Sequence, residues 1–355
     1  MVLVPPTGAM PLLYPGSEIL SFPKNLLFPK KECALRTVVQ NLLNGLAIGS
    51  VYALFALGYT LVFSILRIIN FAHGAIFTVG AYFTYALMGR PFGGGDYVFS
   101  NKRLPFALPF WPAMLLGAVL AGLLNVAIER LAFRPLRKRG SDTLLTLVSS
   151  LGVALMISNA IQNVVGADPL EAQVPMSYTN QHPSVMVLGA PIQTLRFLIM
   201  AVAAVVMFAL WYLLNRTKTG KALKAVSEDA TTSNLLGIST DRLIMFTFAL
   251  CGFVAAIAGT MVSTISGITG PYMGTNYGLI GLAVIIVGGL GDIPGAVVGG
   301  LVLGIAQAFA GAFKIPVLNW IFPSSIKDVI PFLLLFLVLM FRPQGLLGRA
   351  QIQKV

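Results

Sequence analysis

The sequence predicts an all-α polytopic membrane protein of about eight to nine transmembrane helices, with broken helices and an internal inverted repeat. Three observations support this fold class. Of the 355 residues, 57% are hydrophobic and 10% are charged, whereas soluble domains carry about a quarter charged residues. Uncharged stretches that approach the roughly 20 residues of a spanning helix recur along the chain. All 24 Lys and Arg residues lie outside the cores of these stretches.

The N-terminal residues 1–36 come before the first long apolar stretch. They contain six of the 21 prolines, their apolar patches are short, and they lack the charged start of a secretory signal. We therefore expect an irregular or interfacial extension here. The transmembrane domain is predicted at 37–348, followed by a short cytoplasmic tail at 349–355. Its nine apolar segments lie at about 38–63, 70–87, 107–128, 144–164, 197–214, 243–264, 279–291, 295–313 and 328–341.

The basic residues are distributed unequally between the two sides of the membrane. With alternate loops assigned to one side, 14 fall on the side that holds Arg67, 130–139, 216–242 and the C-terminal tail, and 10 fall on the other. The positive-inside rule makes the first side cytoplasmic. This orientation puts the N-terminus outside and the C-terminus inside. The net charge of +12 is then a consequence of membrane topology, and no nucleic-acid partner is expected.

Several chemistries are excluded by what the sequence lacks. None of the 12 Asp and Glu residues lies in the middle of an apolar segment, where proton relays keep one. The nearest approach to a phosphate-binding loop, Gly220-Lys221-Ala222, lacks its first glycine and its hydroxyl residue. His73, His182, Cys33 and Cys251 have no metal-ligand or catalytic spacing. We expect no enzymatic activity, metal or cofactor in this chain, while an autonomous channel or facilitator stays open.

The loop at about 215–242 is expected to contain a short capped helix. Ser227 is the predicted N-cap, and Glu228 and Asp229 would lie in the first turn, where carboxylates stabilise the helix dipole. The same pattern is also compatible with an ordinary solvated connection.

The end of this predicted helix carries apolar side chains. Gly237 is a suitable C-terminal stop, and Leu235 and Leu236 would leave an apolar contact beside it. An exposed Leu-Leu pair behind a Lys-rich approach favours a docking element for a cytoplasmic partner.

Four stretches of the chain resemble the permease subunits of ABC importers for branched-chain amino acids. They are NGLAIGSVYALFALGYTLVFSILRIINFAHGAIFTVGAYF at 44–83, SEDATTSNLLGISTDR in the loop, IIVGGLGDIPGAVVGGLVLG at 285–304 and FRPQGLLG at 341–348. Glu228, Asp229 and Ala230 also resemble the Glu-Ala-Ala loop of ABC permeases. The glycine comes seven residues after Ala230 instead of four, so individual docking contacts do not carry over.

The resemblance implies a bacterial inner-membrane subunit with a defined set of partners. These are a second homologous permease, two cytoplasmic ATPase subunits that use ATP and magnesium, an extracytoplasmic solute-binding protein and the surrounding membrane lipid. The implied solutes are branched-chain or other neutral amino acids. Urea and other amides are the alternative solute class, since similar-looking permeases carry them.

A break inside the membrane is predicted around Asn70, His73 and Gly74. INFAHGAI at 69–76 aligns with LGDIPGAV at 290–297, which pairs Gly74 with Gly295 and His73 with Pro294. Paired breaks in the two halves of a transporter mark substrate paths. Asn70 is expected to cap the helix that begins near His73. One interpretation is that these groups line the path, and the other is that they only cap and pack.

The segments at 279–291 and 295–313 are predicted to form a helical hairpin hinged at 291–294. Small residues allow membrane helices to approach closely, and the hairpin is rich in them. The pathway residues predicted here are Gly288, Gly289, Gly291 and Pro294.

Overall fold

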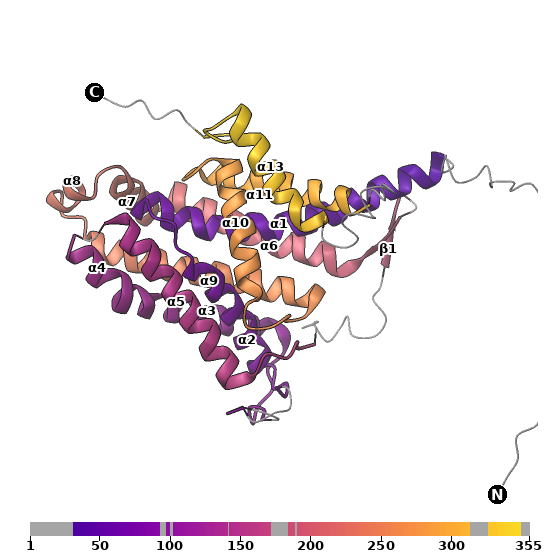
Figure 1. The fold of residues 1–355 in the computed structure, drawn as a ribbon, viewed down its shortest axis with the longest axis horizontal. Helices are drawn as coiled ribbons and strands as arrows, with labels where there is room; N and C mark the ends of the chain where they lie inside the picture. The colour runs from indigo at the N-terminus through magenta and orange to yellow at the C-terminus, as the bar shows by residue number, and fades with distance from the viewer. Residues whose placement is uncertain are drawn as a thin grey trace, which may run out of the picture.

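The computed structural model describes residues 31–92, 97–99, 102–140, 142–171, 184–188, 190–312 and 326–348, and these are mostly helical (Figure 1). The elements are α1 (Lys31–Leu66), α2 (Ala72–Leu87), α3 (Phe110–Ile128), a π-helical turn (Glu129–Phe133), α4 (Arg134–Lys138), α5 (Thr143–Val165), β1 (Ser184–Val187), β2 (Ala190–Gln193), α6 (Thr194–Arg216), α7 (Lys218–Glu228), α8 (Ala230–Leu235), α9 (Thr240–Ser266), α10 (Met273–Gly288), α11 (Ile293–Ala312) and α13 (Ile326–Phe341).

Every predicted apolar segment overlaps one of these helices, and the largest differences are at the starts of α1 and α10, which begin at Lys31 and Met273 and were predicted at about 38 and 279. In the described part of the chain, six helical segments are long and apolar enough to cross a membrane. They are Leu35–Leu66, Phe110–Lys138, Thr143–Val165, Thr194–Arg216, Thr240–Ser266 and Ile293–Ala312, and Met273–Gly288 and Val329–Phe341 are shorter apolar helices. The chain is therefore an α-helical polytopic membrane protein.

The predicted irregular extension ends earlier than expected. Residues 31–36 already belong to α1, so the helix begins before the predicted boundary at 36. The charges of Lys31, Glu32 and Arg36 end the apolar run, but the backbone hydrogen bonds of a helix do not require apolar side chains. Residues 1–30 and 349–355 lie outside the described part of the chain.

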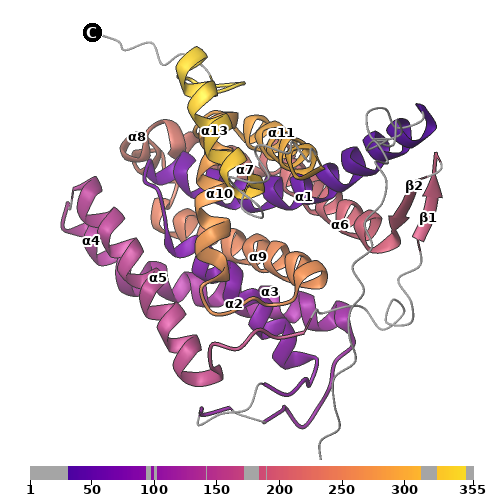
Figure 2. The ribbon, with the colours of Figure 1, turned by 45° about the vertical axis from the view of Figure 1, so that its right-hand side comes forward.

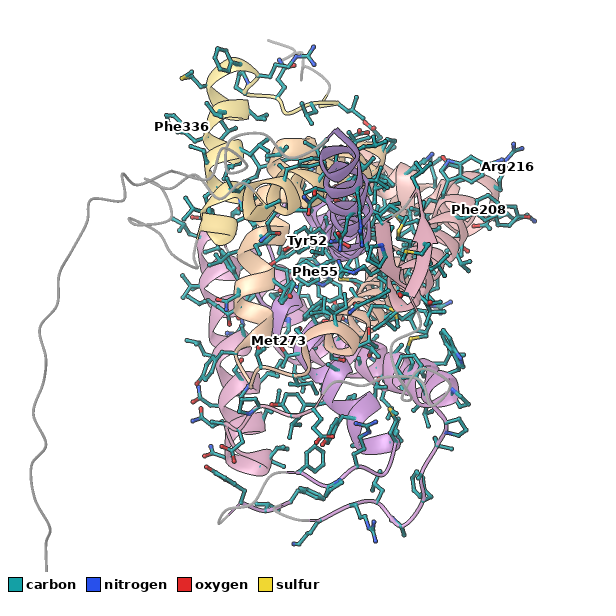
Figure 3. The ribbon with its side chains drawn as sticks, turned by 90° about the vertical axis from the view of Figure 1, so that its right-hand side faces the viewer. Tyr52, Phe55, Phe208, Arg216, Met273 and Phe336 are labelled. Atoms are coloured by element: carbon teal, nitrogen blue, oxygen red, sulfur yellow. The ribbon has the colours of Figure 1, made fainter. Side chains whose placement is uncertain are left out.

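Two long helices form the centre of the molecule. In α1, 83% of the most apolar window is buried, and in α9 67% is buried, against 17% in α5 and 22% in α6. Figures 1 and 2 show α1 and α9 surrounded by the other helices, with α5 and α6 at the periphery. In Figure 3, Tyr52 and Phe55 of α1 lie near the middle, while Phe208 and Phe336 project outward. The outward apolar side chains are those expected to meet lipid.

The predicted cytoplasmic segments gather at one end of the molecule, here called the coupling end. Arg134 and Arg137 pair with Asp241 at 2.8 and 2.9 Å, which joins the 130–139 segment to the start of α9. Arg67 lines a cleft together with Lys224 and parts of α7. These three basic segments therefore lie at one end of the molecule, as a shared side of the membrane requires. The opposite end carries β1, β2 and the bridge between Leu170 and Ile268.

The sequence stretches that carried the family resemblance contact one another. Gly49 of α1 lies against Leu301 and Gly304 of α11, so closely that a Cβ on either glycine would overlap backbone. The backbone N–H groups of Leu346 and Leu347 donate to the carbonyls of Val287 and Gly288 at 2.7 and 3.0 Å. The FRPQGLLG stretch thus closes over the end of the α10–α11 hairpin.

Candidate functional site

The predicted break lies between α1 and α2. Arg67 adopts a left-handed conformation (φ 54°) directly after α1, and α2 begins at Ala72. Asn70 Oδ1 accepts a hydrogen bond from the Ala72 N–H at 3.1 Å. Asn70 thus bonds the first N–H group of α2, as predicted, although the N-cap position itself is occupied by Phe71. Asn70 is 1% exposed, and its Nδ2 has no hydrogen-bond partner among the described residues.

His73 is enclosed by the protein. Its Nε2 lies 3.1 Å from the Phe55 carbonyl and its Nδ1 lies 3.0 Å from the Cys251 Sγ. A carbonyl only accepts, so in the neutral ring Nε2 donates to Phe55 and Nδ1 accepts from the Cys251 thiol. Both ring nitrogens are then used, and the side chain is 1% exposed. This geometry supports the capping and packing interpretation, and a solute contact by His73 stays a prediction.

Gly74 lies where α2 crosses α10. A Cβ on Gly74 would strike the carbonyl of Gly274, and a Cβ on Gly274 would strike the carbonyl of Gly74. The Gly274 N–H also donates to Thr78 Oγ1 at 2.8 Å. The predicted close approach at Gly74 is confirmed. Its partner is the start of α10, however, whereas the aligned repeat segment was 290–297.

A second break precedes α10 and has similar local geometry. Gly267 (φ 71°) follows α9 as Arg67 follows α1, and the five residues 268–272 connect it to α10. The His73 N–H donates to the Asn70 carbonyl at 3.2 Å, and the Met273 N–H donates to the Gly270 carbonyl at 3.2 Å. The two breaks are brought together by the contact between Gly74 and Gly274.

The predicted hairpin exists, with α10 ending at Gly288 and α11 beginning at Ile293. Gly288 lies against Gly295, and Gly289, with φ 120°, lies against Gly348. Asp292 Oδ2 accepts a hydrogen bond from the Gly295 N–H at 2.9 Å and caps α11.

The turn of the hairpin opens toward the coupling end. Gly291 (φ 84°) and the exposed Pro294 line the same cleft as Ser227 and Glu228. The two predicted sets of residues therefore share a surface at one end of the protein, and the role of the hairpin in a solute path stays a prediction.

The predicted helix in the coupling loop is two helices, so the expected cap at Ser227 was wrong. Ser227 lies in the last turn of α7 and donates to the Lys224 carbonyl at 2.7 Å. Glu228 ends α7, whereas it was expected in a first turn. Asp229 is the cap of α8, and its Oδ1 accepts from the N–H groups of Thr231 and Thr232 at 2.8 and 3.1 Å. Asp229 can cap because it lies between the end of α7 and the start of α8, where its carboxylate accepts hydrogen bonds from two backbone amides.

These hydrogen bonds also affect the charge of Asp229. Its bond from the Thr232 hydroxyl, followed by those from the Thr232 and Thr231 amides, lowers the pKa of the carboxyl below its ordinary value. Asp229 therefore carries a negative charge at neutral pH, and this charge lies at the start of α8, which begins at Ala230.

The predicted end of the loop helix is confirmed. Gly237 has φ 84°, and the Ile238 N–H donates to the Ser233 carbonyl at 3.0 Å. Leu235 and Leu236 are 84% and 77% exposed. An apolar pair this exposed beside a fixed helix end is available to a partner.

Polar contacts that the sequence reasoning missed join the elements of the coupling end to one another. Thr240 Oγ1 donates to Asn234 Oδ1 at 2.7 Å, which ties α8 to α9. Arg137 bridges Asp241 and the fully buried carboxylate of Glu129, 3.1 Å away. Glu129 directly follows the predicted apolar segment at 107–128. This position was the signal in the sequence for a buried carboxylate, but the prediction had assigned Glu129 to a loop.

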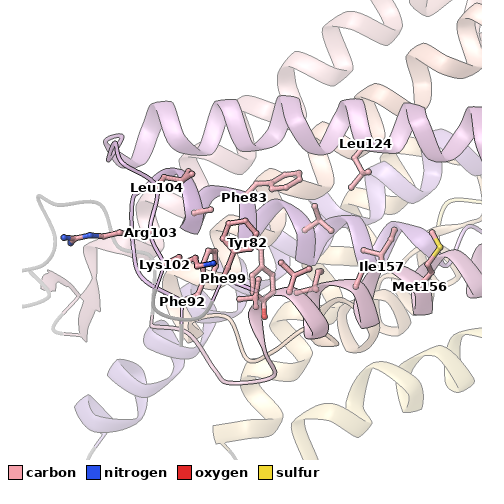
Figure 4. A pocket seen from close by; sticks show the side chains of 16 residues that line it. Tyr82, Phe83, Phe92, Phe99, Lys102, Arg103, Leu104, Leu124, Met156 and Ile157 are labelled. Atoms are coloured by element: carbon pink, nitrogen blue, oxygen red, sulfur yellow. The ribbon is translucent and has the colours of Figure 1, made fainter. Parts of the chain in front are cut away.

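Two cavities differ in their chemistry. One, of about 610 Å³ between α2, α3 and α5, is lined almost wholly by apolar side chains. Figure 4 shows Tyr82 beside it and Arg103 extending away. A zwitterion without polar partners is strongly disfavoured in such a space. The other cavity, of about 730 Å³, is at the opposite end and has polar lining residues on α1, α6, α10 and α11: Asn41, Asn44, Tyr52, Arg196, Asn276 and Gln307.

The sequence reasoning also missed the polar cavity. Asn41, Asn44 and Gln307 lie inside apolar segments, and polar residues there are a signal of function. The prediction had considered Asn70 and His73 as the polar residues of the path and had not considered these three.

Comparison with known proteins agrees with these features. The family described as branched-chain amino acid transport system / permease component matches residues 41–339. The chain is 35% identical to the high-affinity branched-chain amino acid transport system permease protein BraD of Pseudomonas aeruginosa, covering 89% of this chain and 98% of BraD. It is 34% identical to LivH of Escherichia coli K12, a permease protein of the same description, covering 89% and 97%. The ribose import permease protein RbsC of Haemophilus influenzae is 25% identical, covering 75% and 76%. The chain belongs to the family of branched-chain amino acid transport permease components.

Proposed function

We propose that this chain is the membrane-spanning permease subunit of an ATP-driven importer of branched-chain amino acids. The observation that carries the proposal is the family match over residues 41–339, together with identities of 34–35% to BraD and LivH over most of both chains. The chain performs no bond chemistry in this role. It provides a solute path whose access alternates when partner ATPase subunits bind and release ATP with magnesium.

The coupling end is the proposed contact for the two ATPase subunits. Support comes from α8, whose capped start at Asp229 and exposed Leu235 and Leu236 present a fixed element outside the apolar helices. The hydrogen bond between Thr240 and Asn234 joins this element to α9. A displacement of α8 would therefore displace α9.

The central helix α9 carries such a displacement to the breaks. Cys251 of α9 contacts His73, and Gly80 of α2 lies against Ala256 so closely that a Cβ would overlap it. Packed interiors transmit a shift because they have few voids to absorb it. We propose that Asn70, His73 and Gly74 act here as a pivot between α2, α9 and α10, with the hairpin at Gly288, Gly289, Gly291 and Pro294 as a second contact at the coupling end.

The remaining parts of the proposal follow from the family. A second homologous permease would cover part of the peripheral face of α5, where Asn159 is exposed and accepts a hydrogen bond from Tyr272 at 3.1 Å. A solute-binding protein would deliver the amino acid at the opposite end. We propose nine membrane crossings in the inner membrane, because an N-terminus outside and a C-terminus in the cytoplasm require an odd number. The two breaks that meet at Gly74 and Gly274 support an inverted repeat, because α1 and α9 run in opposite directions between the two ends.

The proposed function is tested by leucine uptake into vesicles that contain the purified complex of permease, ATPase subunits and binding protein. We expect uptake that requires ATP and the binding protein. Uptake that persists without both would favour an autonomous facilitator, and uptake of urea with no uptake of leucine would favour the amide class of solute.

A further inference from the structure

The polar cavity at the opposite end contains an arginine that has no counter-ion among the described residues. Arg196 is in the first turn of α6 and is partly buried. It is the one charged residue among the described residues that line the cavity, and none of the described ion pairs includes it. A planar guanidinium in such a position matches a carboxylate in bidentate geometry. A carboxylate of a bound solute would supply the partner that the described residues do not.

Neutral polar groups lie on other helices around the same cavity. Asn41 and Asn44 belong to α1, Asn276 to α10 and Gln307 to α11. Tyr52 donates to Gln307 Oε1 at 2.6 Å, which fixes the orientation of that amide. Amide oxygens accept hydrogen bonds from an ammonium group without trapping it as a carboxylate would.

The rest of the lining is aliphatic. It includes Ile48, Val51, Val262, Leu279 and Ile280. A volume of about 730 Å³ is in the range of small-molecule sites, which are mostly apolar with a few placed polar groups. A branched hydrocarbon side chain is the complementary occupant for such a wall.

We propose that this cavity receives the zwitterion of an aliphatic amino acid and that Arg196 binds its carboxylate. The amides of α1, α10 and α11 then face its ammonium group, and the aliphatic wall contacts its side chain. The inference rests on the proposed function and adds to it a site and a recognition chemistry. Urea has no carboxylate, so this site discriminates against the amide class of solute.

The test compares Arg196→Gln and Arg196→Lys in the full complex, reconstituted in phosphatidylcholine vesicles. Arg103→Gln, which removes an exposed arginine that extends away from the apolar cavity (Figure 4), is the matched control. Arg196→Gln removes a hydrogen bond between charged groups, so we expect leucine uptake to fall about 10- to 100-fold. Binding-protein-stimulated ATP hydrolysis should be retained. Arg196→Lys should recover part of the uptake because it keeps the charge, and the control should transport normally.

Other outcomes would overturn the inference. Normal uptake by Arg196→Gln would exclude carboxylate binding, and parallel loss of uptake and ATP hydrolysis would indicate a structural role. A lipid phosphate is the other source of an anion. If phosphatidylglycerol raises the thermal stability of the wild type and not of Arg196→Gln, while uptake is equal in both, the partner is lipid. A wild-type complex that takes up no leucine would instead refute the proposed function, and this inference with it.

Discussion

Replacing Gly74 with alanine separates a packing role of the helix break from a path-lining role. The added Cβ would overlap the carbonyl of Gly274 and would lie 3.1 Å from its carbonyl carbon, so α2 and α10 must move apart. Overpacking of this kind costs about 1–3 kcal/mol. Alanine also favours a helix over glycine by about 0.5–1 kcal/mol, which offsets part of the cost.

The matched control is Gly152→Ala in α5. No atom lies within 4 Å of the position of its Cβ, so only the gain in helix propensity applies. We expect Gly152→Ala to be neutral or slightly stabilising, and Gly74→Ala to be less stable than this control by about 1–3 kcal/mol. The measurements are the thermal midpoint of the purified permease and leucine uptake per folded molecule in reconstituted vesicles.

The contact is reciprocal, which gives a second measurement. Gly274→Ala should destabilise the permease by a similar amount. Once one alanine has separated the helices, the second should cost less, so the double variant should be less than additive. A Gly74→Ala variant as stable as the control would refute the packing argument. Unchanged stability with strongly reduced specific uptake would instead support a lining role for Gly74.

Four further predictions follow from described contacts. Arg137→Met should destabilise by about 3–5 kcal/mol because it leaves the Glu129 carboxylate buried without a partner, whereas Arg134→Met, at a part-exposed pair, should cost about 0–1 kcal/mol in thermal unfolding; equal losses would contradict the burial argument. Asp229→Ala should weaken ATPase association severalfold in pull-down assays while Asp229→Asn keeps the cap, and equal binding by both would exclude α8 as the docking element. By NMR, Asp229 should titrate with a pKa below the ordinary carboxyl value of about 3.9. Because this pKa is lowered, the stabilisation of α8 by the cap is present above the ordinary value and is lost as the pH falls through the lowered pKa. A titration midpoint at or above about 3.9 would refute the cap. In a background without Cys33 and Cys251, cysteines at Lys221 and Met186 should be labelled from opposite sides of the membrane, and labelling from the same side would contradict the topology.

Local patterns in the sequence were sufficient for the helices and the family. A spanning helix satisfies its own backbone hydrogen bonds, so uncharged runs located the segments that became α1, α5 and α9. Gly237 as a stop and Asn70 as a cap were also predictable, because each acts within a few residues of the helix end that it serves. The family resemblance came from stretches that the structure brings into contact, such as the α10–α11 hairpin and the FRPQGLLG stretch.

Only the tertiary structure decided how distant side chains are used. The partners of His73 come from α1 and α9, and the partner of Gly74 is a glycine 200 residues later, so no local spacing could assign them. The choice between Ser227 and Asp229 as a cap depended on where α7 ends, which is at Glu228. The polar cavity combines single residues from α1, α6, α10 and α11. Each of these residues is unremarkable in its own segment, and its role arises because helices far apart in sequence meet around one space.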